Sequence, residues 1–247
     1  MQLLPTVTPE TALFLDFDGT LAEIAPTPDA VRIATGLVPT LAALHRLLGG
    51  ALAIVTGRPI ADIDHYLAPL ELPAAGEHGA QYRMVDGSRP ALDQPPLAAA
   101  VQAMEQLAAL HPGLLVEHKD HSVALHFRHA PELESLCFDA VQAVVAGRPG
   151  VEVLHGKCVF EVKPAGVNKG QAIGVFMSAP PFAGRTPIFV GDDVTDESGF
   201  VAVQRFGGRG IKIGEGPTQA QHRCLSPAAL RGWLASARTT LAPASAA

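Results

Sequence analysis

Short apolar segments alternate with helical patterns at both ends of the chain, and this alternation restricts the fold more than any other feature. Strands that alternate with helices are typical of a parallel sheet with helices packed on its faces. The sequence therefore predicts an α/β fold with a Rossmann-like parallel sheet to which both ends contribute. The strand-like segments are 11–17, 51–57, 187–191 and 210–214, and the helical ones are 37–48, a segment from Pro59, 169–177, a segment after Thr195, and 228–238.

The middle of the chain follows a different pattern. In LLVEHK and SVALHFRH, apolar and polar residues alternate with a period of two, which indicates a sheet covered on one face only. Two helical segments, at about 97–111 and 131–146, and two more strand-like segments, VEVL and KCVFEVK, complete a small α/β unit. We expect this unit to be an insertion at about residues 89–165, within a core domain formed by residues 1–88 and 166–247.

Composition limits the classes of partner and compartment. The chain has 247 residues, with 24 Asp and Glu against 18 Lys and Arg, and a net charge of -6 argues against binding to nucleic acid or an anionic membrane. Its three cysteines are widely spaced, which favours neither a disulfide framework nor a zinc site. The first residues lack the pattern of a signal peptide, and no apolar run approaches the roughly 18 residues of a membrane span. We expect a soluble, cytoplasmic protein.

Two aspartates follow the first buried strand directly. Asp16 and Asp18 stand two residues apart in the string LFLDFDGTL, so their side chains leave the strand on the same side. In an open parallel sheet, ligands bind at the carboxyl ends of the strands, so this pair lies where chemistry is expected. An Asp-Gly turn with no chemical role is the alternative interpretation.

A second acidic cluster follows the apolar run PIFVG. The string GDDVTDE contains Asp192, Asp193 and Asp196, and such a group of carboxylates is tolerable when a divalent cation such as Mg²⁺ binds to it. The alternative is an acidic helix N-terminus, with Asp193 or Thr195 as the N-cap. Both interpretations can hold for different members of the cluster.

Two further helix starts could bind phosphate. Thr56, Gly57 and Arg58 connect a strand to a helix, and a hydroxyl with free N–H groups at a helix N-terminus forms a pocket for a phosphate. Lys169 begins another helix, where a positive charge opposes the helix dipole unless an anion is nearby. An ordinary turn and a solvated lysine are the alternatives.

Together, these carboxylates, the hydroxyl and the lysine are the functional groups that phosphoryl transfer with Mg²⁺ requires. In this combination the sequence resembles the haloacid dehalogenase superfamily, whose four motifs match Asp16-Phe-Asp18-Gly-Thr20, Thr56-Gly-Arg58, Lys169 and the GDDVTD string from Gly191. Within that superfamily it is similar to the trehalose-6-phosphate phosphatases, through the strings GDDVTDE, GEHGAQYR, VEHKDHSVALHFR and GKCVFEVKP. The resemblance implies a core of the haloacid dehalogenase type with an inserted α/β cap domain.

The resemblance also implies catalytic roles. Asp16 would attack the phosphoryl group to form an aspartyl phosphate, which water then hydrolyses. Asp18 would protonate the leaving sugar oxygen and then deprotonate the water, a role that needs a carboxyl pKa raised towards neutrality. Thr56 and Lys169 would bind the phosphoryl oxygens.

The implied cofactor is Mg²⁺. Asp16, the backbone carbonyl of Asp18, and Asp192 would hold the ion, with Asp193 and Asp196 as nearby carboxylates. The division of labour within the acidic cluster stays open at this point.

The substrate-binding candidates come from both parts of the chain. Patterning alone slightly favours a solvated surface for the polar face of the insertion, whereas the resemblance assigns some of its residues to sugar recognition. The candidates are Lys119, Arg128, Lys157 and Glu161 in the insertion, and Gly57, Arg58, Glu77 and His78 in the core.

We therefore predict Mg²⁺-dependent hydrolysis of trehalose 6-phosphate to trehalose and phosphate. A phosphatase for sucrose 6-phosphate or a glycosyl phosphoglycerate, a phosphomutase or transferase, and a non-catalytic sugar-phosphate-binding module are the alternatives. The expected partner is a small sugar phosphate, and any synthase that supplies it would be a separate chain.

Overall fold

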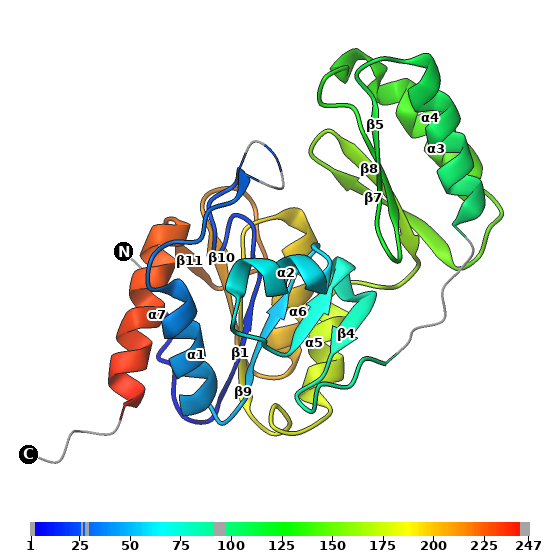
Figure 1. The fold of residues 1–247 in the computed structure, drawn as a ribbon. Helices are drawn as coiled ribbons and strands as arrows, with labels where there is room; N and C mark the ends of the chain where they lie inside the picture. Colours follow the sequence, from blue (N-terminus) through cyan, green and yellow to red (C-terminus); the bar gives the residue numbers. More distant parts are fainter. Residues whose placement is uncertain (1–2, 26, 28–29, 91–96, 243–247) are drawn as a thin grey trace, which may run out of the picture. The chain divides into compact units, whose positions relative to one another are not determined.

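The structure of the protein, a computed structural model, describes residues 3–25, 27, 30–90 and 97–242. It consists of two compact units (Figure 1). The core unit comprises Met1–Pro90 with Asn168–Ala247, and the inserted unit comprises Ala91–Val167.

A seven-stranded sheet forms the centre of the core unit, in the order β11-β10-β9-β1-β2-β3-β4. All neighbouring strands are parallel except β3 and β4. Chain order reverses at β1, so the carboxyl ends of β1, β2 and β9 meet at a topological switch point, where α/β folds bind ligands. The strands are β1 (Thr11–Leu15), β2 (Leu52–Val55), β3 (Ala74–Gly76), β4 (Gln81–Arg83), β9 (Thr186–Gly191), β10 (Arg209–Ile213) and β11 (His222–Cys224).

Helices cover both faces of this sheet (Figure 1). Helix α1 contacts α7, and α5 contacts α6. The right-handed crossovers β1-α1-β2 and β9-α6-β10 run in opposite directions along the sheet, which puts α1 and α6 on opposite faces. The helices are α1 (Leu37–Leu47), α2 (Ile60–Leu67), α5 (Lys169–Met177), α6 (Glu197–Arg205) and α7 (Pro227–Leu241), with short 3₁₀ turns η2 (Glu77–Gly79) and η4 (Val194–Asp196).

Burial on both faces explains why the central strands are continuous apolar runs. Every residue of β1 and of β2 is buried. Phenylalanine rings fill the space between sheet and helices, and the Phe14 and Phe182 rings stack with centroids 5.3 Å apart. This packed layer holds the ends of the central strands in fixed positions.

The inserted unit is an antiparallel sheet with helices on one face (Figure 1). Its strand order is β5-β6-β8-β7, and Val123, Leu125 and Phe127 lie in its apolar core as the alternation predicted. The elements are α3 (Ala98–Leu110), β5 (Leu115–His118), β6 (Val123–His126), the 3₁₀ turn η3 (Pro131–Leu133), α4 (Glu134–Val145), β7 (Val151–Gly156) and β8 (Val159–Pro164).

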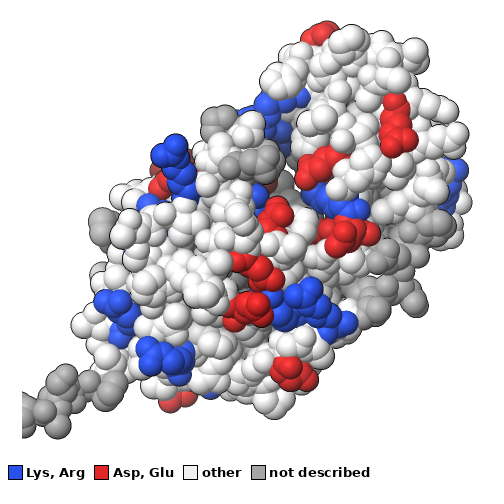
Figure 2. All heavy atoms as spheres, in the orientation of Figure 1, with Lys and Arg blue, Asp and Glu red and all other residues white. Residues whose placement is uncertain are grey.

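Surface charge and helix hydropathy indicate which partners the protein could bind. Figure 2 shows basic side chains in small groups beside acidic ones, with no broad basic surface on the visible face. Among the described helices, none combines the length and the apolar character that a membrane crossing requires.

Candidate active site

Asp16 is the first residue after the central strand β1. Its backbone N–H donates to the carbonyl of Val190 at 2.9 Å, which extends the pairing of β1 with β9 by one residue. The residue is only 4% exposed, and its Oδ2 accepts a hydrogen bond from the Thr20 hydroxyl at 3.1 Å. The backbone therefore fixes this carboxyl group at the switch point of the sheet.

Lys169 is the cation of the site. Asn168 caps the N-terminus of α5 by accepting from the N–H of Gln171 at 3.0 Å, which places Lys169 at the first helical position. The buried Nζ lies 2.8 Å from Asp16 Oδ1 and 2.5 Å from Asp196 Oδ1. Burial alone would lower the pKa of Lys169, but the two carboxylates raise it overall, so this lysine stays charged.

Three carboxyl groups gather around this one lysine. Asp16, Asp192 and Asp196 each offer an oxygen, and these oxygens lie within 4.8 Å of one another. Burial raises the pKa of Asp16, and Asp196 and Asp192 raise it further, while Lys169 opposes them in part. Burial and the charge of Asp196 also raise the pKa of Asp192 to about 6. Three carboxyl groups thus stand against two nearby ammonium groups, Lys169 and Lys212, and a divalent cation would fit beside them.

Asp196 differs from the other two because two backbone N–H groups donate to its side chain. Its Oδ2 accepts the backbone N–H groups of Asp192 and Asp193, both at 2.9 Å, and its Oδ1 binds Lys169. Gly191 makes room for this arrangement, since a Cβ there would lie 2.3 Å from the Asp196 Cγ atom. Asp196 thus ties the end of β9 to the start of α5.

Asp193 lies outside the group of three. Its side chain is exposed and accepts from the N–H of Val194 at 2.7 Å, and it also forms a capping box with Asp196. The interpretation of Asp193 as an N-cap is therefore confirmed, and its carboxylate is not among the three that the structure brings together.

The turn after β1 packs directly on Asp192. Gly19 has a φ of 69°, and a Cβ at this position would lie 2.1 Å from Asp192 Oδ2. The Thr20 hydroxyl lies 3.5 Å from Asp192 Oδ1. A glycine is required here both by the backbone conformation and by the close approach.

Asp18 and Arg58 form a two-pronged ion pair. Arg58 Nε and Nη2 lie 2.5 and 2.8 Å from the two carboxylate oxygens of Asp18. Burial opposes the positive charge, but Asp18 outweighs it and raises the pKa of Arg58 overall. The guanidinium also lies over the Tyr66 ring, with 5.2 Å from Cζ to the ring centroid. The Asp18 side chain remains 39% exposed, so solvent and ligands can reach it.

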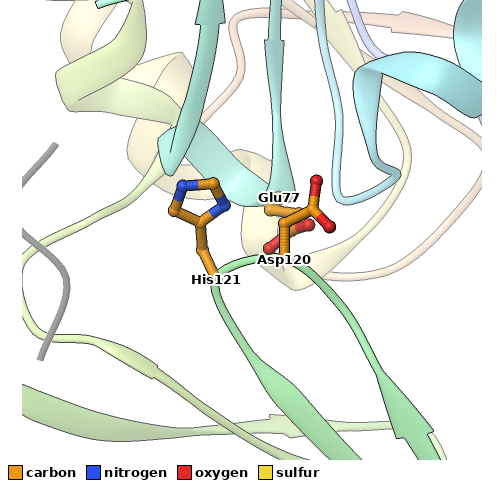
Figure 3. Close-up of side chains that lie close together, drawn as sticks. All are labelled: Glu77, Asp120 and His121. Carbon is orange, nitrogen blue, oxygen red and sulfur yellow. The ribbon is translucent and has the colours of Figure 1, made fainter. Parts of the chain in front are cut away.

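The loops after β2 and β3 hold each other through backbone hydrogen bonds. The N–H of His78 donates to the carbonyl of Thr56 at 2.9 Å, and the N–H of Glu77 donates to the carbonyl of Arg58 at 3.0 Å. Glu77, which follows β3 directly (Figure 3), and His78 both have positive φ, at 47° and 60°. The His78 ring covers Gly57, where a Cβ would lie 2.6 Å from the ring Cε1. Such a strained turn is typical of a functional site.

Sequence reasoning missed Gln81, which supports these loops. The first residues of α2 lack a side-chain cap of their own, and Gln81 Oε1 accepts the N–H of Ile60 at 2.9 Å in its place. Its Nε2 donates to Glu77 Oε1 at 3.2 Å. The only signal in the sequence is Pro59 at a helix start, which has no oxygen to offer as a cap.

In the inserted unit, Lys119 and Glu161 are brought together. Lys119 Nζ lies 3.0 Å from Glu161 Oε2, and both side chains are largely buried. Ser122, which sequence reasoning also missed, donates its hydroxyl to Glu161 Oε1 at 2.6 Å. Ser122 falls on the polar face of the alternating segment with His126, so the pattern could have indicated it.

The remaining predicted residues of this unit lie apart from that pair. Arg128 follows β6 and Lys157 lies in the turn between β7 and β8, and both are exposed. Neither forms an ion pair with any residue that the structure describes. The turn between β5 and β6 carries Asp120 and His121 (Figure 3).

The fold is that of the haloacid dehalogenase-like hydrolases. A haloacid dehalogenase-like hydrolase from B. subtilis superposes with a TM-score of 0.66 at 13% identity, over 91% of this chain and 99% of that one, which shows the fold. The family model for trehalose-phosphatase matches residues 14–227. The chain belongs to the trehalose-phosphatase family, and it is a phosphoric monoester hydrolase.

Two relatives support this assignment. The chain is 40% identical to the trehalose-6-phosphate phosphatase of Escherichia coli (strain K12). The alignment spans 240 residues, which are 96% of this chain and 90% of the relative. It is 42% identical to a probable trehalose-phosphate phosphatase of Sinorhizobium fredii. This alignment spans 232 residues, which are 91% of this chain and 86% of the relative.

Proposed function

We propose that this protein hydrolyses trehalose 6-phosphate to trehalose and phosphate, with Mg²⁺ and through an aspartyl phosphate on Asp16. The observation that carries the chemistry is the buried Asp16 carboxyl at the end of β1, in contact with Lys169 and grouped with two further carboxyl groups. The choice of substrate rests on the similarity to the trehalose-6-phosphate phosphatase of Escherichia coli.

The group of carboxylates fits Mg²⁺, which prefers oxygen ligands. We assign Asp16, Asp192 and the backbone carbonyl of Asp18 as its ligands, because Asp196 is held by two backbone N–H groups as well as by Lys169, and Asp193 is an N-cap. When bound, Mg²⁺ would neutralise charge on the phosphoryl group and orient it towards Asp16.

The chain's own residues then account for two displacements. An oxygen of Asp16 attacks phosphorus, the bond from phosphorus to the sugar oxygen breaks, and Asp18 gives its proton to that leaving oxygen. In the second step water attacks phosphorus, Asp18 takes a proton from it, and the bond from phosphorus to Asp16 breaks. For this, the Asp18 carboxyl must part from Arg58 and contact the leaving oxygen. The Asp18 side chain is 39% exposed, so the substrate can reach it.

The charge on the transferred group is met by donors on two helix starts. Lys169 donates from the first turn of α5, and Thr56 with the N–H of Gly57 precedes α2. Because Lys169 already contacts Asp16, it is positioned to bind a phosphoryl oxygen next to the attacking one.

We also propose that the inserted unit is a cap domain that recognises the sugar part of the substrate. A buried lysine and glutamate, Lys119 and Glu161, supply a donor and an acceptor for hydroxyl groups. Arg128 and Lys157 of this unit and Glu77 and His78 of the core unit are the further sugar-binding candidates. We place the enzyme in the cytoplasm, with any synthase on a separate chain.

A panel of substrates tests the proposal. Phosphate release with Mg²⁺ is measured on trehalose 6-phosphate, sucrose 6-phosphate, glucose 6-phosphate and p-nitrophenyl phosphate, with Asp16→Asn as the blank. Asp86→Asn, at an exposed turn, is the matched control and keeps full activity. We expect the highest kcat/KM on trehalose 6-phosphate. A higher value on another sugar phosphate refutes the substrate, and turnover by Asp16→Asn refutes the nucleophile.

A further inference from the structure

Lys212 is a buried lysine beside the candidate active site that the proposed chemistry does not use. It lies on β10, where its register partner on β9 is Gly191, the residue before Asp192. The residue is only 6% exposed, and its Nζ donates to the backbone carbonyl of Asp192. A second carbonyl, that of Ile213, lies 3.4 Å away.

The surroundings of this ammonium make its position costly. A buried charge is normally paired with an opposite charge, because removing it from water without one is unfavourable. The hydrogen bonds of Lys212 go to backbone carbonyls, and its charge acts on the nearby carboxylate of Asp192, whose pKa it lowers. This ammonium is therefore held by the main chain at Asp192 and by the charge of the same residue.

The hydrogen bonds around Asp192 indicate what Lys212 does. The N–H of Asp192 donates to Asp196 at 2.9 Å, while its carbonyl accepts from Lys212, so its backbone is held at both ends. Its side chain packs against Gly19 and lies 3.5 Å from the hydroxyl of Thr20. With the backbone fixed in this way, the carboxylate has little freedom to move away from Asp16.

We propose that Lys212 is a positioning residue that fixes the main chain at Asp192 and so pre-organises the carboxylates for the divalent cation. This inference rests on the proposed function, since it assigns Asp192 to the metal. Residues that orient metal ligands typically contribute about 10-fold to 100-fold to metal affinity or activity. Lys212 would act through Asp192 without touching the substrate.

The test uses three substitutions at one position. Lys212→Met removes the donor, Lys212→Gln replaces it with a neutral amide too short to reach the Asp192 carbonyl, and Lys212→Arg keeps a charged donor. Mg²⁺ binding is measured by isothermal titration calorimetry on the substrate-free protein, and the Mg²⁺ dependence of phosphate release is measured beside it. We expect Lys212→Met to weaken Mg²⁺ binding about 10-fold and to raise the half-saturating Mg²⁺ concentration by the same factor, with KM for the substrate nearly unchanged at saturating Mg²⁺. Lys212→Arg is expected to restore most of the affinity.

Arg209→Met is the matched control, because Arg209 is an exposed basic residue on the same strand whose register partner on β9 is Ile188, three residues before Gly191. It is expected to leave Mg²⁺ binding unchanged. Thermal unfolding of every variant shows whether it folds, and Lys212→Gln carries the test if Lys212→Met does not. Wild-type affinity in a folded Lys212→Met or Lys212→Gln protein overturns the proposal, as does an equal loss in Lys212→Arg. Because calorimetry needs no turnover, an inactive wild type that binds Mg²⁺ would refute the proposed function and leave this inference standing.

Discussion

Gly19→Ala offers a test of how tightly the site is packed. A methyl group at this position would lie 2.1 Å from Asp192 Oδ2, whereas real Cβ atoms essentially never approach within 3.0 Å. The backbone at Gly19 and the carboxylate of Asp192 must therefore separate by about 1 Å. A misplacement of that size can lower activity about 100-fold. The positive φ of 69° adds about 1–2 kcal/mol of conformational strain.

Strain and misplacement can be separated with a second glycine. Gly184 has a φ of 78° and precedes β9 at the end of the strand away from the site, and a methyl group added to it would meet no described atom within 4 Å. Gly184→Ala therefore carries about the same 1–2 kcal/mol of strain without the clash. We expect both variants to melt several degrees lower, at roughly 2–4 °C per kcal/mol.

The assay is phosphate release from trehalose 6-phosphate at saturating Mg²⁺, with circular dichroism to record unfolding. Gly19→Ala is expected to lose about 100-fold in kcat/KM, while Gly184→Ala keeps wild-type activity below its melting temperature. Near-normal activity in a folded Gly19→Ala protein would show that the turn after β1 yields at little cost, and it would refute the reasoning from close packing.

Three further predictions concern the metal, the sugar and the pH dependence of stability. Asp192→Ala is expected to lower Mg²⁺-dependent turnover about 100-fold, whereas Asp193→Ala loses an N-cap worth about 1 kcal/mol and keeps its activity. Equal losses of activity in the two variants would contradict the assignment of Asp192 to the metal and of Asp193 to the helix cap. Ser122→Ala leaves Glu161 Oε1 without its donor and is expected to lower kcat/KM on trehalose 6-phosphate about 10-fold with p-nitrophenyl phosphate unaffected, and a parallel loss on both substrates would argue against a role in sugar binding. Because the folded-state pKa values of Asp16 and Asp192 are raised, to about 6 for Asp192, protonation stabilises the metal-free protein, and this stability is lost as pH rises through 6. Calorimetric melting without metal should therefore give a higher Tm at pH 5 than at pH 7.5 by a margin that Asp192→Asn reduces, and a margin unchanged in that variant would contradict the assignment.

Much of the fold could be predicted because the signals were local and strong. The apolar runs of β1, β9 and β10 and the alternation in β6 each fix an element type within a few residues. Strands β3, β4 and β11 were not predicted, because each has three residues and its pairing depends on a neighbouring strand.

In the candidate site, too, the residues with local signals could be predicted and those placed by tertiary packing could not. Strand ends identified Asp16, Lys169 and the acidic cluster, since the position of each follows from the element that precedes or follows it. The separate roles of Asp193 and Asp196 depend on which side chain turns back on the backbone, and that choice is made by tertiary packing around Gly191. The ion pair between Asp18 and Arg58 likewise joins segments 40 residues apart and has no local signal.

The pairing of β1 with β9 also bears on the order in which the molecule forms. Leu15 pairs with Val190, so the aspartates at positions 16 and 192 meet only after a long loop has closed, whereas β5 with β6 and β7 with β8 are joined by short turns. Contacts between distant parts of a chain form more slowly than local ones. We therefore expect the hairpins of the inserted unit to gain protection first in pulsed hydrogen exchange, and the enzyme to become competent only in the last stage of folding.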